Sequence, residues 1–227
     1  MWIPLLLLLL QTAPAGERVA ITTPDGSKLG ARFVDAGRGS PGVLFFPMCA
    51  PDATDGWMPV AERLRSAGIS SLIVTYRGTN GNTTGTGSGD QRGNDADAMV
   101  AYLRSRVGVT APLAFGGASC GVWFALRTAA AHAEHTRAVV ALSGPHTDSQ
   151  IEHVRKTPAL AVFSGASAGE PPSPEWARAL KDAAAHPGSR VVILEQKAHG
   201  TALFGVHPTF AADIAAWLSA QLIPRGR

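Results

Sequence analysis

The clearest chemical signal in the sequence is a serine between two glycines. Gly117-Ala118-Ser119-Cys120-Gly121 fits the pattern Gly-x-Ser-x-Gly, in which the glycines let a strand turn sharply into a helix and leave the serine hydroxyl exposed at the edge of a sheet. A serine in this position attacks a carbonyl carbon and forms a covalent acyl intermediate. The pattern therefore predicts that Ser119 is a catalytic nucleophile.

The same pattern occurs a second time, in Gly165-Ala166-Ser167-Ala168-Gly169. Ser119 follows the short apolar run 113–115 and precedes an alanine-rich helical run, as an elbow between a strand and a helix requires. After Ser167 the chain continues Glu170-Pro171-Pro172-Ser173-Pro174, and prolines at these places oppose a helix that begins directly after the serine. We therefore predict that Ser167 is an ordinary loop residue.

The segments that must position Ser119 alternate between short apolar runs and helical patterns. Two runs, 18–23 and 28–35, flank the turn Pro24-Asp25-Gly26 and predict an antiparallel hairpin. The later apolar runs do not alternate with polar residues, as burial of a strand on both faces requires. Further strands are predicted at 43–46, 71–76, 113–115, 138–143, 159–163 and 190–194, and helices at 57–67, 95–106, 121–132, 176–185 and 209–222. The expected fold class is one α/β domain, 16–227, with a mainly parallel sheet of about eight strands and helices on both faces.

One long segment, 77–93, is rich in Gly, Thr and Asn and is predicted to be a loop. It follows a predicted parallel strand, and loops at the carboxyl ends of such strands form the rim where ligands bind. Two interpretations stay open, a flexible loop that faces the substrate and a plain solvent-exposed connector.

With these elements, the chain resembles the α/β-hydrolase superfamily, and within it the small esterases without a lid domain and the dienelactone-hydrolase-like members. The resemblance rests on the opening hairpin, the strand end Val43-Leu44-Phe45-Phe46-Pro47, the Ser119 elbow and a late histidine. It implies the α/β-hydrolase fold and nucleophilic serine chemistry. Only residues 145–158 separate two predicted strands where a lid would be inserted, so we expect no lid domain.

A serine nucleophile needs a base that accepts its proton during the attack, and histidine suits this exchange near neutral pH. His199 follows the last predicted strand and precedes the last predicted helix, which is the loop that carries the catalytic histidine in the resembled family. His146 lies at another strand exit, Gly144-Pro145-His146, and is expected to contact the substrate. Trp57 is a second candidate for the substrate pocket.

The acid that orients the histidine departs from the family pattern. The family usually places an Asp in the loop after the penultimate strand, and here that loop, 164–170, contains none. Glu170 is the first candidate because it keeps the chain order serine, acid, histidine. Asp148, just after the preceding strand, is the second. A third interpretation is that the chain has no triad acid.

Acyl transfer also requires two backbone N–H groups that point at the developing oxyanion. One belongs to the residue after the nucleophile, Cys120. The other comes from Pro47-Met48-Cys49, which occupies the place of the family's His-Gly-x and makes Cys49 the donor, with Met48 as the alternative. Both cysteines thus flank one predicted oxyanion hole, and in an oxidising compartment we predict a Cys49–Cys120 disulfide. The alternative is a pair of reduced, buried cysteines.

Composition restricts the partners and the compartment. The formal net charge is +3 and the basic residues are scattered, so a nucleic-acid partner has no support. An apolar run, 3–10, is too short to cross a bilayer and is followed by Ala13-Pro14-Ala15, which predicts a signal peptide over 1–15 and a secreted or periplasmic protein. An uncleaved anchor is the alternative, because no Lys or Arg precedes the run. We expect a monomer without a membrane span, a cofactor or a metal ion.

The residues together predict an exported serine hydrolase that cleaves small-molecule or polymeric carboxylic esters through an acyl-enzyme intermediate. A dienelactone-hydrolase-like or thioesterase activity is one alternative, although dienelactone hydrolases carry cysteine where this chain has Ser119. A non-catalytic binding protein on the same scaffold is the other, because the acid has no clear position.

Overall fold

The computed structural model describes residues 16–50, 53–78 and 89–224, so the predicted signal peptide lies outside the described residues. The described part of the chain contains one eight-stranded sheet with the order β1-β2-β4-β3-β5-β6-β7-β8. Its strands are β1 (Glu17–Thr22), β2 (Lys28–Val34), β3 (Gly42–Phe46), β4 (Ser70–Val74), β5 (Leu113–Ala118), β6 (Thr136–Leu142), β7 (Ala161–Ser167) and β8 (Arg190–Leu194).

The strand directions follow the predicted pattern. β1 pairs antiparallel with β2, and β2 pairs antiparallel with β4. All later neighbours in the sheet pair in parallel. The opening hairpin and the mainly parallel sheet of the sequence prediction are therefore confirmed.

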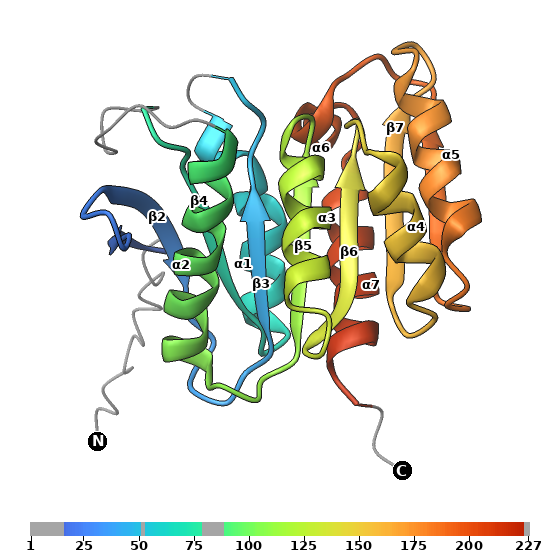
Figure 1. The fold of residues 1–227 in the computed structure, drawn as a ribbon. Coiled ribbons are helices and arrows are strands. Elements are labelled where there is room, and N and C mark those ends of the chain that lie inside the picture. Colours follow the sequence, from blue (N-terminus) through green and yellow to red (C-terminus); the bar gives the residue numbers. More distant parts are fainter. Residues whose placement is uncertain (1–15, 51–52, 79–88, 225–227) are drawn as a thin grey trace, which may run out of the picture.

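Helices cover both faces of the sheet (Figure 1). One face carries α2 (Gly89–Val107), α3 (Gly121–Ala131), α4 (Asp148–Lys156) and α5 (Ser173–Ala183), and the other carries α1 (Met58–Ser66) and α7 (Phe210–Leu222). Short helical turns lie between these elements: η1 (Ala53–Trp57), η2 (Gly200–Ala202) and α6 (Leu203–Val206). The molecule is thus a three-layer α/β/α sandwich.

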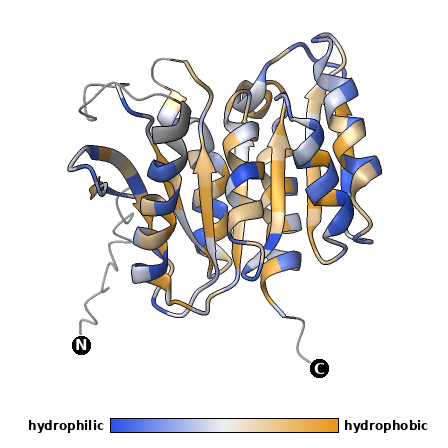
Figure 2. Ribbon diagram, viewed as in Figure 1, coloured by the Kyte–Doolittle hydropathy of each residue, from blue (hydrophilic) through white to orange (hydrophobic). Residues whose placement is uncertain are grey.

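The core consists of two apolar layers, one on each side of the sheet. Successive side chains of a strand point to opposite faces, so Leu44 and Phe46 join the layer under α2 and α3, whereas Val43 and Phe45 join the layer under α1 and α7. Figure 2 shows the result, with apolar colours along the central strands and polar colours on the outer sides of the helices. Burial on both faces explains why the inner strands are continuously apolar.

Parallel pairing brings the carboxyl ends of β3, β5, β6, β7 and β8 to one edge of the sheet, the upper edge in Figure 1. Each candidate catalytic residue follows one of these strands. The register also determines which residues are neighbours at this edge. Phe46 lies opposite Gly117, and Ser167 lies opposite Leu194.

Several predicted boundaries need correction. Helix α2 begins at Gly89, so the predicted loop 77–93 ends earlier, and its residues 79–88 lie outside the described part. Ser167 is not a loop residue but the buried last residue of β7, because β7 pairs with β8 up to that position. Helix α5 begins at Ser173 despite the prolines, since Pro174 falls in its first turn, where the missing N–H costs no hydrogen bond.

A buried ion pair ties the hairpin to the central strands. Arg77, just after β4, has a side chain only 4% exposed, and its Nη2 lies 2.6 Å from Oδ1 of Asp95 on α2. Arg77 also pairs with Asp25 in the hairpin turn, at 2.8 Å from Nη1 to Oδ2, and its hydrogen bond holds the pKa of Asp25 well below the usual range. Arg77 therefore connects three segments that are distant in the sequence.

Candidate active site

Ser119 lies in a strained turn between β5 and α3. Its φ is +53°, in the left-handed region that non-glycine residues rarely adopt, at a cost of about 1–3 kcal/mol. Its backbone N–H donates to the Leu142 carbonyl at 2.8 Å, and its carbonyl accepts from the Val122 N–H at 3.0 Å. The surrounding backbone thus holds the strained conformation, which turns the chain abruptly from strand to helix.

Three glycines give this turn the space that it needs. A Cβ atom at Gly121 would stand 2.5 Å from the Phe46 carbonyl oxygen and 2.6 Å from that of Pro47. A Cβ atom at Gly117 would collide with the backbone of Gly121, and one at Gly144 with the Ser119 carbonyl oxygen. The glycines of the motif are required by close backbone approach.

The predicted base and the first candidate acid are paired. His199 follows β8, and its Nδ1 lies 2.8 Å from Oε2 of Glu170, in the loop after β7. The Glu170 backbone is fixed by a turn in which its N–H donates to Ser167 at 3.2 Å and its carbonyl accepts from Ser173 at 2.9 Å. Asp148 instead begins α4, is exposed and has no recorded contact with His199. The structure thus brings Glu170, and not Asp148, to the histidine.

The histidine loop lies against the elbow. Gly200 has a φ of +56°, and a Cβ atom there would stand 2.5 Å from Met48 Sδ and 3.3 Å from Ala118 Cβ. No hydrogen bond between Ser119 and His199 is recorded in the structure; in enzymes without substrate this contact is often long and tightens in the complex. About 43% of the His199 side chain is exposed, so the site is open to solvent.

A disulfide joins the two loops of the predicted oxyanion hole. Cys49 and Cys120 are bonded, with their Cα atoms 5.9 Å apart. The register explains their meeting, since each lies three residues beyond one of the paired positions Phe46 and Gly117. The predicted disulfide is therefore present, and Cys49 is exposed and Cys120 half-buried.

Free backbone donors gather at the same place. For the N–H groups of Met48, Cys49 and Cys120, no acceptor is recorded among the described residues. Cys120 directly precedes α3, and the first N–H groups of a helix have no partner within it and favour negative charge. Unpaired N–H groups on two crosslinked loops beside Ser119 are what an oxyanion hole requires.

Of the two expected substrate contacts, Trp57 needs correction and His146 stays a prediction. Trp57 is completely buried, stacked on Phe45 with ring centroids 4.5 Å apart, and its ring offers no surface to a substrate. That expectation is corrected, because the indole packs in the core and donates from Nε1 to the Phe46 carbonyl at 3.1 Å. His146 is half-buried beside α5, and burial lowers the pKa of its imidazole while a hydrogen bond with the Trp176 backbone acts against this shift. Its Nε2 has no partner among the described residues.

Two residues of this edge were not expected from the sequence. Ser143, after β6, has a φ of +51°, is 2% exposed and donates from its backbone N–H to Gly165 at 2.8 Å. It repeats, one strand further, the turn that Ser119 makes. Tyr76, after β4, donates from its hydroxyl to the Pro47 carbonyl at 2.7 Å. A serine before a glycine and a tyrosine near a strand end are too common to be singled out by pattern.

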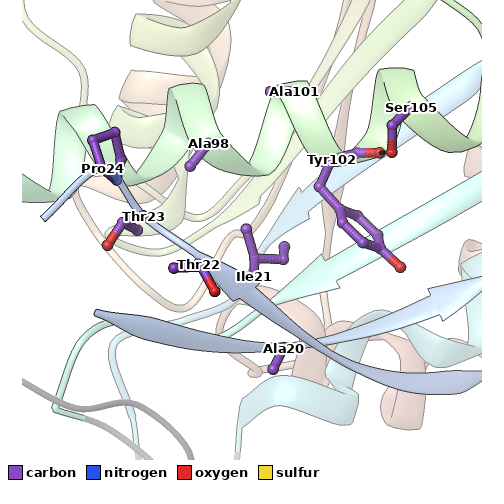
Figure 3. A pocket seen from close by; sticks show the side chains of 9 residues that line it. All are labelled: Ala20, Ile21, Thr22, Thr23, Pro24, Ala98, Ala101, Tyr102 and Ser105. Atoms are coloured by element: carbon purple, nitrogen blue, oxygen red, sulfur yellow. Dashed lines mark hydrogen bonds between the residues drawn. The ribbon is translucent and has the colours of Figure 1, made fainter. Parts of the chain in front are cut away.

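A shallow groove of about 490 Å³ lies elsewhere, between β1 and α2 (Figure 3). Ile21 and Tyr102 are among the residues that line it, and none of the predicted catalytic residues is.

Within the described residues, no helix has the length and apolar composition needed to span a bilayer. The described residues also contain no group of three or more His, Cys, Asp or Glu side chains that could hold a metal ion.

The chain has the α/β-hydrolase fold, as the resemblance implied. An esterase from Pyrococcus furiosus superposes with a TM-score of 0.70 over 91% of each chain, at 17% sequence identity. Est1E from Butyrivibrio proteoclasticus, in a structure with bound ferulic acid, gives 0.73 over 91% of this chain and 100% of its own, at 14% identity. A predicted CIB-like hydrolase from Thermoplasma acidophilum gives 0.73 over 90% and 98%, at 13% identity. Neither a protein-family model nor a curated protein sequence matches the chain.

The close approach at Gly121 makes a first prediction. Gly121→Ala places a methyl group against two backbone oxygens that cannot rotate away, so we expect a loss of about 1–3 kcal/mol in the free energy of unfolding, measured in urea. Gly205→Ala is the control, because a Cβ atom there meets nothing within 4 Å. Equal stability of the two variants would contradict the steric explanation.

The disulfide makes a second prediction. It spans 71 residues, and the double variant Cys49→Ser, Cys120→Ser should lose about 4 kcal/mol of unfolding free energy through the larger entropy of the unfolded chain. A dithiol reductant should destabilise the parent to a similar extent and leave the double variant unchanged. A parent protein with the same unfolding curve with and without dithiol is the contrary result.

Proposed function

We propose that the protein is a serine hydrolase that cleaves carboxylic esters through an acyl-enzyme intermediate. The observation that carries the proposal is the His199–Glu170 pair, 2.8 Å from Nδ1 to Oε2, at the sheet edge where Ser119 occupies a strained elbow. Serine, histidine and carboxylate in this chain order supply a nucleophile, a base and a group that orients the base.

In the proposed reaction, Ser119 Oγ attacks the ester carbonyl carbon while His199 Nε2 accepts the hydroxyl proton. The Glu170 carboxylate accepts a hydrogen bond from Nδ1–H, which leaves the lone pair on Nε2 and stabilises the imidazolium that forms. The N–H of Cys120, with that of Cys49 or Met48, binds the oxyanion.

Collapse of the tetrahedral intermediate expels the alcohol, which takes its proton from His199. A water molecule then attacks the acyl carbon, with His199 again accepting a proton and returning it to Ser119 Oγ as the carboxylic acid departs. No group outside the chain and the two reactants is needed.

The comparisons and the shape of the site support an ester as substrate. One of the similar structures is an esterase, and another, Est1E, holds ferulic acid. Between β6 and β7 the chain forms only the short helix α4, so nothing in this segment covers the exposed His199. We infer an open site that accepts small-molecule esters or the accessible esters of a polymer.

The alternatives have less support. A non-catalytic binding protein on this scaffold has no need of an acid on the histidine, whereas Glu170 Oε2 lies 2.8 Å from His199 Nδ1. Cys120 does not act as a nucleophile of the dienelactone-hydrolase kind, because its sulfur is bonded to Cys49. We further infer that the protein is exported, with 1–15 as signal peptide and 16–227 as the mature domain, because disulfides persist in oxidising compartments.

The nucleophile is tested with a matched pair of variants. Ser119→Ala should abolish labelling by a fluorophosphonate and lower kcat for p-nitrophenyl acetate by roughly 10⁴-fold or more, because no other group forms the acyl-enzyme. Ser167→Ala, in the second Gly-x-Ser-x-Gly sequence, should label and turn over like the parent. Labelling that persists in Ser119→Ala, or that is lost only in Ser167→Ala, would refute the assignment.

The acid is tested in the same way. Glu170→Gln should lower kcat by roughly 10²- to 10⁴-fold, since the amide neither stabilises the imidazolium nor selects the productive tautomer. Asp148→Asn, the other candidate acid, should have the activity of the parent. A larger loss of kcat in Asp148→Asn than in Glu170→Gln would reverse the assignment.

A further inference from the structure

Two backbone carbonyls, one at the end of β3 and one directly after it, are both bound by buried side chains. The Phe46 carbonyl accepts from Trp57 Nε1 at 3.1 Å, and the Pro47 carbonyl accepts from the Tyr76 hydroxyl at 2.7 Å. Both oxygens also lie against the Cα of Gly121, at the start of α3. These carbonyls therefore have fixed directions directly before the N–H groups of Met48 and Cys49, which have no acceptor among the described residues.

Peptide geometry converts the Tyr76 contact into a constraint on those donors. A trans peptide unit is planar, and its C=O and N–H point in opposite directions. A hydrogen bond that fixes the Pro47 carbonyl therefore also fixes the Met48 N–H, on the opposite side of the unit, and the path of the chain into Cys49. If this unit rotates, it turns a carbonyl dipole toward the place where the oxyanion develops.

Tyr76 is well placed for this role because its side chain is buried and packed in the core. It is 6% exposed, and its ring packs on Phe124 of α3, with centroids 5.0 Å apart. The loop that it holds reaches the rest of the site, since the Met48 side chain lies against Gly200, next to His199, and Cys49 is bonded to Cys120.

We infer that Tyr76 is a positioning residue of the oxyanion hole, acting through the Pro47 carbonyl. The inference rests on the proposed function. Among the described contacts, Tyr76 touches neither the reacting serine nor the histidine. It orders the loop whose N–H groups bind the negatively charged oxyanion. Because this charge appears only in the transition state, the loss of the hydroxyl lowers kcat and leaves KM nearly unchanged.

The chain offers a matched control, since it contains two tyrosines. Tyr102, on α2, lines the groove of Figure 3, and its hydroxyl accepts from Arg106 Nη1 at 2.6 Å. Three strands separate β1, beside this groove, from β5 and Ser119. Tyr76→Phe therefore removes the hydroxyl that donates to the Pro47 carbonyl, after β4, and Tyr102→Phe removes the hydroxyl that accepts from Arg106, on α2.

The experiment measures kcat and KM for p-nitrophenyl acetate in the parent and in both variants, with unfolding midpoints to establish that each variant is folded. Tyr76→Phe is expected to lower kcat about tenfold with KM within about twofold, and Tyr102→Phe to retain both. Inhibition by a trifluoromethyl ketone, whose serine adduct places an oxyanion in the hole, should weaken in Tyr76→Phe in parallel with kcat/KM.

The outcomes separate the inference from the proposed function. A parent that neither hydrolyses the ester nor reacts with a fluorophosphonate overturns both. An active parent whose kcat in Tyr76→Phe equals that in Tyr102→Phe overturns the role of Tyr76 alone, as does a rise in KM at unchanged kcat.

Discussion

The site depends on how closely backbone segments approach one another around Ser119. The serine adopts a left-handed conformation at the end of β5, and the segments beside it leave no room for a Cβ atom at Gly117, Gly121 or Gly144. The approach at Gly121 brings the start of α3 against the carbonyls of Phe46 and Pro47, so the loop after β3 and the elbow form one unit. The strain of the elbow is thus sustained by contacts that also bring together the two loops whose N–H groups we propose as oxyanion donors.

The parallel sheet brings the remaining segments of the site to the same edge. Adjacent strands end at the same edge, so the segments that follow β3, β5, β7 and β8 reach one place without long connections. The disulfide crosslinks the first two of these segments, and the Glu170–His199 contact links the last two. The hairpin is attached separately, on the side of β3 away from β5. There the buried Arg77, just after β4, pairs with Asp95 of α2 and with Asp25 in the hairpin turn.

The local sequence pattern was sufficient to predict the place of some residues and not of others. The fold and the disulfide were predicted and are confirmed, because hydrophobic runs and chain order determine which strands are neighbours. Glu170 remained one of several interpretations, since a loop sequence does not reveal where a carboxylate points; its contact with His199 follows from the pairing of β7 with β8. Trp57 was misassigned because an aromatic residue at a helix start has the same appearance in the core and in a pocket. Tyr76 and Ser143 acquire their importance only from tertiary contacts.

A crystal structure of the protein after reaction with an alkyl fluorophosphonate would show whether Ser119, the crosslinked loops and the His199–Glu170 pair form one acyl-transfer site. We predict phosphorus bonded to Ser119 Oγ and a phosphonyl oxygen about 2.7–3.1 Å from the backbone N–H of Cys120 and of Cys49 or Met48. His199 should remain on Glu170. A phosphonyl oxygen directed away from these N–H groups, or an adduct on another residue, would contradict this prediction.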